Sequence, residues 1–145
     1  MGLKEDILAA ESKLYADIES VMENDVASAT KSVMQQVIKD EVYAKYNPTY
    51  YVRRGYDGGL QDEKNMVSVY DRKTMTLEVT NMTRDNDYTR MGDRLVAPVV
   101  ESGIGYAWKR IMPRPFHKKT EKMMANKIFE NTLEAGLAVK GYKTR

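Results

Sequence analysis

The residues of this 145-residue chain that could do chemistry gather between Ala97 and Thr120, a stretch with its only His, its only Trp and three of its four Pro. His117 is the one imidazole that could serve as a general base. Glu101 is the one acid beside a glycine turn, Gly103-Ile104-Gly105. No nucleophile motif accompanies these residues, and the turn lacks the third glycine of a dinucleotide loop. We therefore expect no enzyme activity, no cofactor and no metal.

The composition excludes several classes of protein. Absence of cysteine removes disulfides and thiolate catalysis, and a single His removes any site that needs two imidazoles. No apolar run approaches the roughly 20 residues of a membrane-spanning helix, and the first residues do not form a signal peptide. The charge is split, because residues 1–46 carry five basic against nine acidic side chains and residues 47–145 carry eighteen against twelve. Such a chain could satisfy its charges internally or dock head to tail on its own copies.

The elements that must position this stretch begin with a long helix, predicted over residues 3–46. Apolar residues recur there at steps of mostly three and four, and the segment holds no proline. Asn24-Asp25 is its weakest point and could break it in two. The stripe is irregular, which favours a helix laid along a sheet or a neighbouring subunit over a free coiled coil.

A loop is predicted over residues 47–65, rich in Tyr and Arg. Asp57-Gly58-Gly59 is a sequence that strongly favours a turn. The tyrosines and arginines could form a nucleic-acid or partner patch, since both types are common at interfaces. The other interpretation, which we prefer together with a protein interface, is a loop whose tyrosines lie at the edge of the core.

A small antiparallel sheet is predicted over residues 66–101. Residues 66–70 and 74–81 alternate as a hairpin, and the apolar run at 96–101 is predicted as a third strand. The polar residues 82–95 between them are predicted to form a long exposed loop. Asn81-Met82-Thr83 matches a glycosylation sequon that we expect to have no role. Glu101, at the end of the third strand, is expected to pair with Arg114 or Lys109.

A last helix is predicted over residues 115–140. Pro115 suits its first turn, and Gly141 suits its end. Its apolar residues are predicted to form one continuous face against the core, with Phe116 buried at its start. The opposite face is basic, which is typical of a solvated surface, although a helix that binds a membrane surface or a calmodulin-type partner has the same pattern. The whole chain, residues 1–145, is predicted to be one domain of the α+β class, with both helices packed on the sheet.

Three short motifs, in this order, resemble those of the phage neck and tail-component family. They are Gly58-Gly59-Leu60 after the first helix, Val100-Glu101-Ser102-Gly103, and Arg114-Pro115-Phe116 before the last helix. Ser102 stands where the family usually has an aromatic residue. The resemblance spans roughly residues 3–138.

The resemblance implies a structural protein of the virion neck, a head–tail connector or tail-completion protein assembled in the host cytoplasm. It implies a homo-oligomeric ring, a hexamer or a dodecamer, that joins portal-side head-completion proteins to the tail terminator or tail tube protein. DNA would pass through the ring without specific recognition, and no membrane is involved. The residues predicted to shape the subunit or its interfaces are Tyr50, Tyr51, Arg53, Arg54, Gly58, Gly59, Leu60, Glu101, Gly103, Trp108, Arg114, Pro115 and Phe116.

Two other functions fit the same sequence. The chain could be a small nucleic-acid-binding protein that uses its basic last helix with Arg53 and Arg54. It could also be an adaptor whose amphipathic helix binds a host protein.

Overall fold

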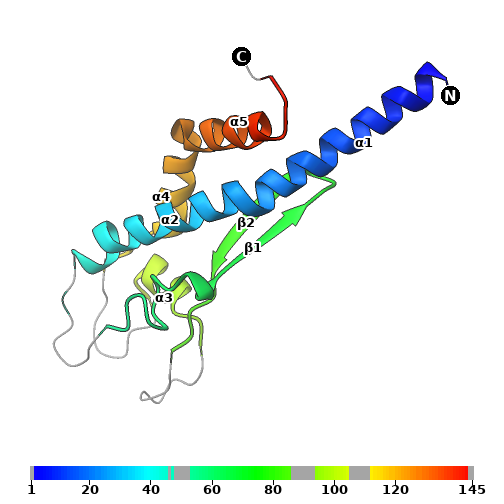
Figure 1. The fold of residues 1–145 in the computed structure, drawn as a ribbon. Coiled ribbons are helices and arrows are strands. Elements are labelled where there is room, and N and C mark those ends of the chain that lie inside the picture. The colour runs from blue at the N-terminus through cyan, green and yellow to red at the C-terminus, as the bar shows by residue number, and fades with distance from the viewer. Residues whose placement is uncertain (1, 46, 48–52, 86–93, 105–111, 144–145) are drawn as a thin grey trace.

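The computed structural model describes residues 2–45, 47, 53–85, 94–104 and 112–143. One long helix runs through the molecule, and a two-stranded hairpin and the C-terminal helices lie along it (Figure 1). The α+β class, with a long N-terminal helix, a C-terminal helical segment and a small antiparallel sheet, is confirmed.

The long helix consists of α1 (Leu3–Val21) and α2 (Ala27–Val37), each followed by a π-helical turn, Met22–Val26 and Ile38–Tyr43. The backbone stays right-handed helical through these joints, so the segment is one continuous helix. Asn24 lies in the first π turn, and its side-chain amide donates to the Ser20 carbonyl at 2.7 Å. The predicted weak point is therefore a widened turn, and the helix does not break there.

The hairpin pairs β1 (Met66–Asp71) with β2 (Thr76–Asn81), in a register that sets Met66 opposite Asn81. Within the described residues these are the only two strands. Met66, Ser68 and Tyr70 point inward with their β2 partners, while Val67 and Val69 point outward and are exposed. The predicted hairpin is thus confirmed within a few residues at each end.

The predicted third strand at 96–101 is wrong, because that run forms the short helix α3 (Ala97–Ser102). Pro98 lies in its first turn, where a missing N–H costs nothing. Gly103 ends it in the left-handed conformation, with φ of 69°. A short apolar run does not by itself distinguish a strand from a buried helical turn, and here Pro and Gly decide for the helix.

The C-terminal helix, predicted from residue 115, begins one residue later at Phe116, and it is not continuous. It consists of α4 (Phe116–Met123), a π-helical turn (Met124–Ile128) and α5 (Phe129–Val139). Lys127 has φ of 69°, a left-handed value that kinks the chain between α4 and α5. Gly141 closes α5 as predicted, because its N–H and that of Tyr142 bond to the carbonyls of Ala138 and Leu137.

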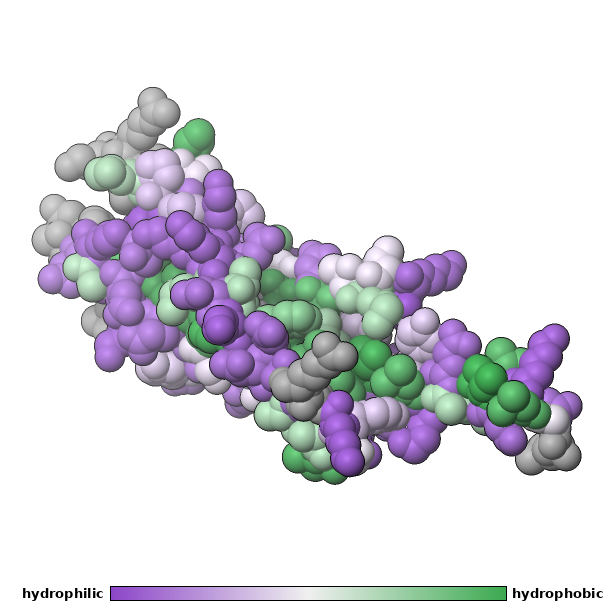
Figure 2. All heavy atoms as spheres, turned by 90° about the horizontal axis from the view of Figure 1, so that it is seen from above, coloured by the Kyte–Doolittle hydropathy of each residue, from purple (hydrophilic) through white to green (hydrophobic). Residues whose placement is uncertain are grey.

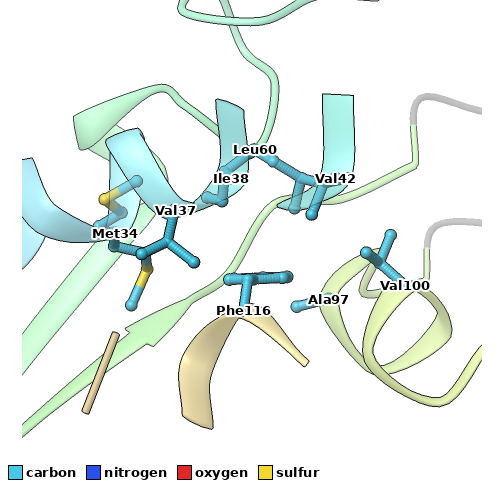
Figure 3. Close-up of a cluster of buried hydrophobic side chains, with 9 residues drawn as sticks. Met34, Val37, Ile38, Val42, Leu60, Ala97, Val100 and Phe116 are labelled. Atoms are coloured by element: carbon cyan, nitrogen blue, oxygen red, sulfur yellow. The ribbon is translucent and has the colours of Figure 1, made fainter. Parts of the chain in front are cut away.

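Two apolar clusters hold these elements together. The first surrounds Phe116, which is 0% exposed and lies among side chains of α2, the second π turn and α3 (Figure 3). The second joins the long helix to the kink and the hairpin, and its buried members are Val21, Met22, Val26 and Met124. Gly136 brings α5 against the long helix, since a Cβ there would lie 2.4 Å from a Val21 methyl.

Candidate functional site

The segment after the first helix is held by the end of β2. The Asn81 side-chain amide donates to the Leu60 carbonyl at 2.7 Å, and the Thr83 hydroxyl lies 3.2 Å from the Gly59 carbonyl. The Thr83 backbone N–H and hydroxyl both lie within hydrogen-bond distance of the Asn81 amide oxygen. Asn81 and Thr83 are each 1% exposed, so the sequon expected to have no role is a buried structural pair.

His117 joins three elements at the same place. Its Nε2 accepts the Asn81 backbone N–H at 3.0 Å, which requires a proton on Nδ1. Nδ1 then donates to Glu101 Oε1 at 2.8 Å, and the His117 backbone N–H donates to the same oxygen at 2.6 Å. The lone pair that a general base would use is therefore already occupied by a backbone amide.

The expected pairing of Glu101 with Arg114 is wrong, because Glu101 pairs with His117. Arg114 is buried, and its Nη1 donates to the Val42 carbonyl at 3.3 Å. The other expected partner, Lys109, lies outside the described residues. The Glu101 carboxylate, near the C-terminal end of α3, thus fixes the position of His117 at the start of α4. The sequence spacing of these two residues does not indicate that they pair.

Both arginines of the loop at residues 47–65 are used within the chain. Arg53 Nη1 donates to the Tyr43 carbonyl at 2.8 Å, and its guanidinium lies over the Tyr43 ring at 4.6 Å. Arg54 Nη2 donates to the Arg84 carbonyl at 2.6 Å. The arginines therefore fasten the loop to the end of the first helix and to the segment after β2.

The glycine turn has the geometry that its sequence predicts. Gly58 has φ of 76°, and its N–H donates to Asp62 Oδ2 at 2.8 Å, which together with the Lys64 N–H holds the pKa of that carboxyl below its usual value. Gly59 and Leu60 are buried. Pro115 directly precedes α4. Tyr50, Tyr51 and Trp108 lie outside the described residues, and so does most of the loop predicted at 82–95.

One exposed apolar surface lies on the N-terminal arm, which we define as residues 2–16 at the start of α1. Every residue of the arm is exposed, and Leu3 and Ile7 are exposed to 77% and 56%. Figure 2 shows hydrophobic side chains at the projecting end of the molecule, where Figure 1 places the N-terminus. The sequence periodicity predicts this apolar stripe, but it does not show that the first half of the stripe is exposed.

A second exposed surface lies at the bend between α4 and α5, and we call it the kink surface. It is hollowed between the side chains of Lys122, Met123, Ala125 and Asn126. Lys118, Lys122 and Lys127 are exposed beside it, and no ion pair is found for them within the described part of the chain. The surface is basic at its edge and apolar at its centre.

The described residues offer little else that could do chemistry. They contain no cluster of three acidic, His or Cys side chains that could hold a metal ion. None of the helices that the structure describes has both the length and the apolar character to cross a membrane. The fold and its contacts define a small α+β protein whose sequence motifs brace the chain internally and whose projecting helix carries exposed apolar side chains.

The comparison with protein families identifies the group to which the chain belongs. The family model YomN matches residues 6–139, and the chain therefore belongs to the YomN family, a phage-derived protein family. Comparisons with curated proteins and with solved structures each found no match.

Proposed function

We propose that this protein is a structural component of the phage neck, in which copies assemble into a ring that joins the head connector to the tail. The observation that carries the proposal is the N-terminal arm, about four turns of helix with no buried residue. Membership of a phage-derived family supports the phage setting, and the motif resemblance supports the neck.

An uncovered arm favours assembly on physical grounds. A helix of about 12–15 residues is marginally stable in water unless its apolar face packs against something. The arm carries Leu3, Ile7, Leu8, Leu14 and Tyr15 at its surface. Exposed apolar patches of this kind are typical of protein–protein contacts. We therefore infer that the arm is buried in the assembled state.

The charge distribution favours a ring over a symmetric dimer. A closed ring is built from two different, complementary faces on each subunit. The first 46 residues are acidic and the remainder basic, by four and six charges. The outer layers of the ring would contact portal-side head-completion proteins on one side and the tail terminator or tail tube protein on the other. DNA would pass through the centre.

The proposal is tested on the purified full-length protein, alone and mixed with portal and head-completion proteins of the same phage. We expect closed rings in negative-stain electron microscopy and a single sedimenting species much heavier than the 16.6 kDa monomer. In the phage, loss of the gene should leave DNA-filled heads without tails. A protein that remains monomeric in every mixture would contradict the proposal.

Nucleic-acid binding remains the second candidate, and the exposed lysines of the kink surface are what favour it. Arg53 and Arg54 would contribute less, since both donate to carbonyls of the chain itself. A gel-retardation series across salt separates the two functions, because phosphate-driven binding falls steeply as ionic strength rises. Strong binding at physiological salt by a monomeric protein would favour this candidate.

A further inference from the structure

We propose that the N-terminal arm of one copy docks on the kink surface of the next copy, a contact that rests on the proposed ring and specifies how it closes. The contact is heterologous, so each subunit gives its arm in one direction and receives an arm in the other. Two observations on the arm and two on the kink surface point to this pairing.

The first observation is that the apolar stripe of the arm continues a stripe that is buried further along the same helix. Leu3, Ile7, Leu14, Ile18 and Val21 lie on one face at helical spacing. Val21 is 1% exposed and packs with Ile18 in the cluster that includes the kink residue Met124 and residues of α5. The buried half of the stripe is therefore already matched to the C-terminal helices, and the exposed half has the same chemistry.

The second observation is the charge of the arm. Asp6 and Glu11 flank the apolar stripe on its two sides, and neither forms an ion pair within the described residues. Of the two arm lysines, Lys13 is paired with Asp17 at 2.6 Å. An acidic apolar stripe fits a basic apolar surface.

The kink surface has the complementary features. Met123 is 44% exposed at the edge of the hollow, and Lys122 lines the same hollow. Lys127 holds a left-handed backbone conformation that a side chain disfavours. Backbone strain of this kind tends to persist where it shapes a functional surface, and here it lies at the bend, next to Asn126 at the edge of the hollow.

The arm cannot reach the kink surface of its own subunit. Met124 packs on the long helix beside Val21, Met22 and Val26. The helix is continuous from there to Leu3, and at about 1.5 Å per residue the tip lies roughly 27 Å away. An arm docked on the kink surface therefore comes from a second copy, and repetition of this heterologous contact gives a ring when the rotation between neighbouring copies closes.

The test uses two full-length variants with changes only at exposed positions. The arm variant carries Leu3→Ser and Ile7→Ser, and the kink variant carries Lys122→Glu and Met123→Ser. Each is compared with Val67→Ser, which alters an exposed residue on the outer face of β1. Circular dichroism melting establishes that all three remain folded, and sedimentation velocity reports their mass.

We expect each interface variant alone to be monomeric and the Val67→Ser control to assemble like the wild type. An equal mixture of the two interface variants should form a one-to-one dimer and nothing larger, because one intact arm still meets one intact kink surface. The charge reversals Glu11→Lys and Lys122→Glu should each weaken assembly by about tenfold, and the two together in one chain should restore it.

The outcomes separate this inference from the proposed ring. If the wild type assembles and the kink variant assembles equally well, the arm docks elsewhere and the inference is wrong, while the ring stands. A mixture that stays monomeric would also overturn it. If the wild type assembles neither alone nor with the connector proteins, the ring proposal fails first.

Discussion

Phe116 is the residue on which the first core cluster depends. It is fully buried between side chains of α2, the second π turn and α3, which come from distant parts of the chain (Figure 3). Phe116→Ala should lower the free energy of unfolding by about 3–5 kcal/mol, because both the transfer energy and a new cavity count against the variant. Urea denaturation followed by circular dichroism measures this.

The control for that substitution is Phe129→Ala at the start of α5. Phe129 is 39% exposed, so its loss should cost much less than the loss of Phe116. Equal effects from the two changes would contradict the central place of Phe116 in the core.

Gly136 allows the closest approach between α5 and the long helix. Gly→Ala in an exposed helix interior normally stabilises by about 1 kcal/mol. Here a Cβ would lie 2.4 Å from Val21 Cγ1 and 2.7 Å from Asp25 Oδ2, so Gly136→Ala should destabilise instead. A lower melting temperature confirms the contact, and a higher one would show that the helices do not cross there.

Partial rescue of that variant provides its control. Val21→Ala removes both Val21 methyl groups that a residue-136 Cβ would meet. Val21→Ala should lower the free energy of unfolding less in the Gly136→Ala variant than in the wild type, because it also relieves the clash with the new Cβ.

At the scale of elements, the sequence predicts those helices and strands whose positions depend on hydrophobic periodicity and on turn residues. The long helix, the hairpin and the helix start at Phe116 follow from helical spacing, strict alternation and proline geometry. The run at 96–101 was misassigned because β-branched residues favour a strand locally, whereas the Gly103 cap and contacts of Val100 with the core favour a helix. The kink at Lys127 has no sequence signal, because the left-handed backbone conformation is one that lysine rarely adopts.

The contacts of the candidate site were less predictable than its elements. The partners of the motif residues Leu60, Glu101 and Phe116 could not be predicted from the sequence, because they come from other elements of the fold. Asn81 and His117 lie 36 positions apart, and only the fold brings them together. The exposed half of the first helix is also set by where α5 and the hairpin end. Sequence periodicity carries no information about those ends.

Glu41 links the end of the first helix to α4, and its ion pairs predict that the stability of the fold decreases in acid. It forms ion pairs with Lys119 and Lys45, which hold the pKa of its carboxyl below the usual value. A lowered folded-state pKa stabilises the fold above the unfolded value, and this contribution is lost as pH falls through the folded value. Melting temperature should therefore fall below about pH 4.5, and Glu41→Gln should flatten that decline.

The control for the acid experiment is Glu121→Gln, an exposed residue of α4 outside this pair of contacts. It should leave the slope of melting temperature against pH unchanged. Residual acid sensitivity in Glu41→Gln is expected from Asp17 and Asp62, whose carboxyl pKa values are also lowered by hydrogen bonds. An unchanged slope in Glu41→Gln would contradict the role of this carboxylate.

At the scale of the whole molecule, the fold separates a braced body from an uncovered arm (Figure 1). The body holds both apolar clusters and the hydrogen bonds that join Leu60, Asn81 and His117. At the base of the arm, Tyr142 donates to Asp17 at 2.7 Å, and Lys13 of the arm lies over the Tyr142 ring. This division suits a subunit that folds alone and completes its packing only on assembly.

That division predicts a gradient of amide hydrogen exchange along the first helix. In the monomeric arm variant, amides before about residue 12 should exchange fast, because every described residue of that part of the helix is exposed. Amides of α2 should exchange slowly, since that helix carries the buried Met34 and Val37. In the assembled wild type the arm should become protected while α2 changes little, since the arm gains cover on the kink surface and α2 is not part of that contact. Arm amides that exchange equally fast in monomer and assembly would mean that some other surface joins the copies.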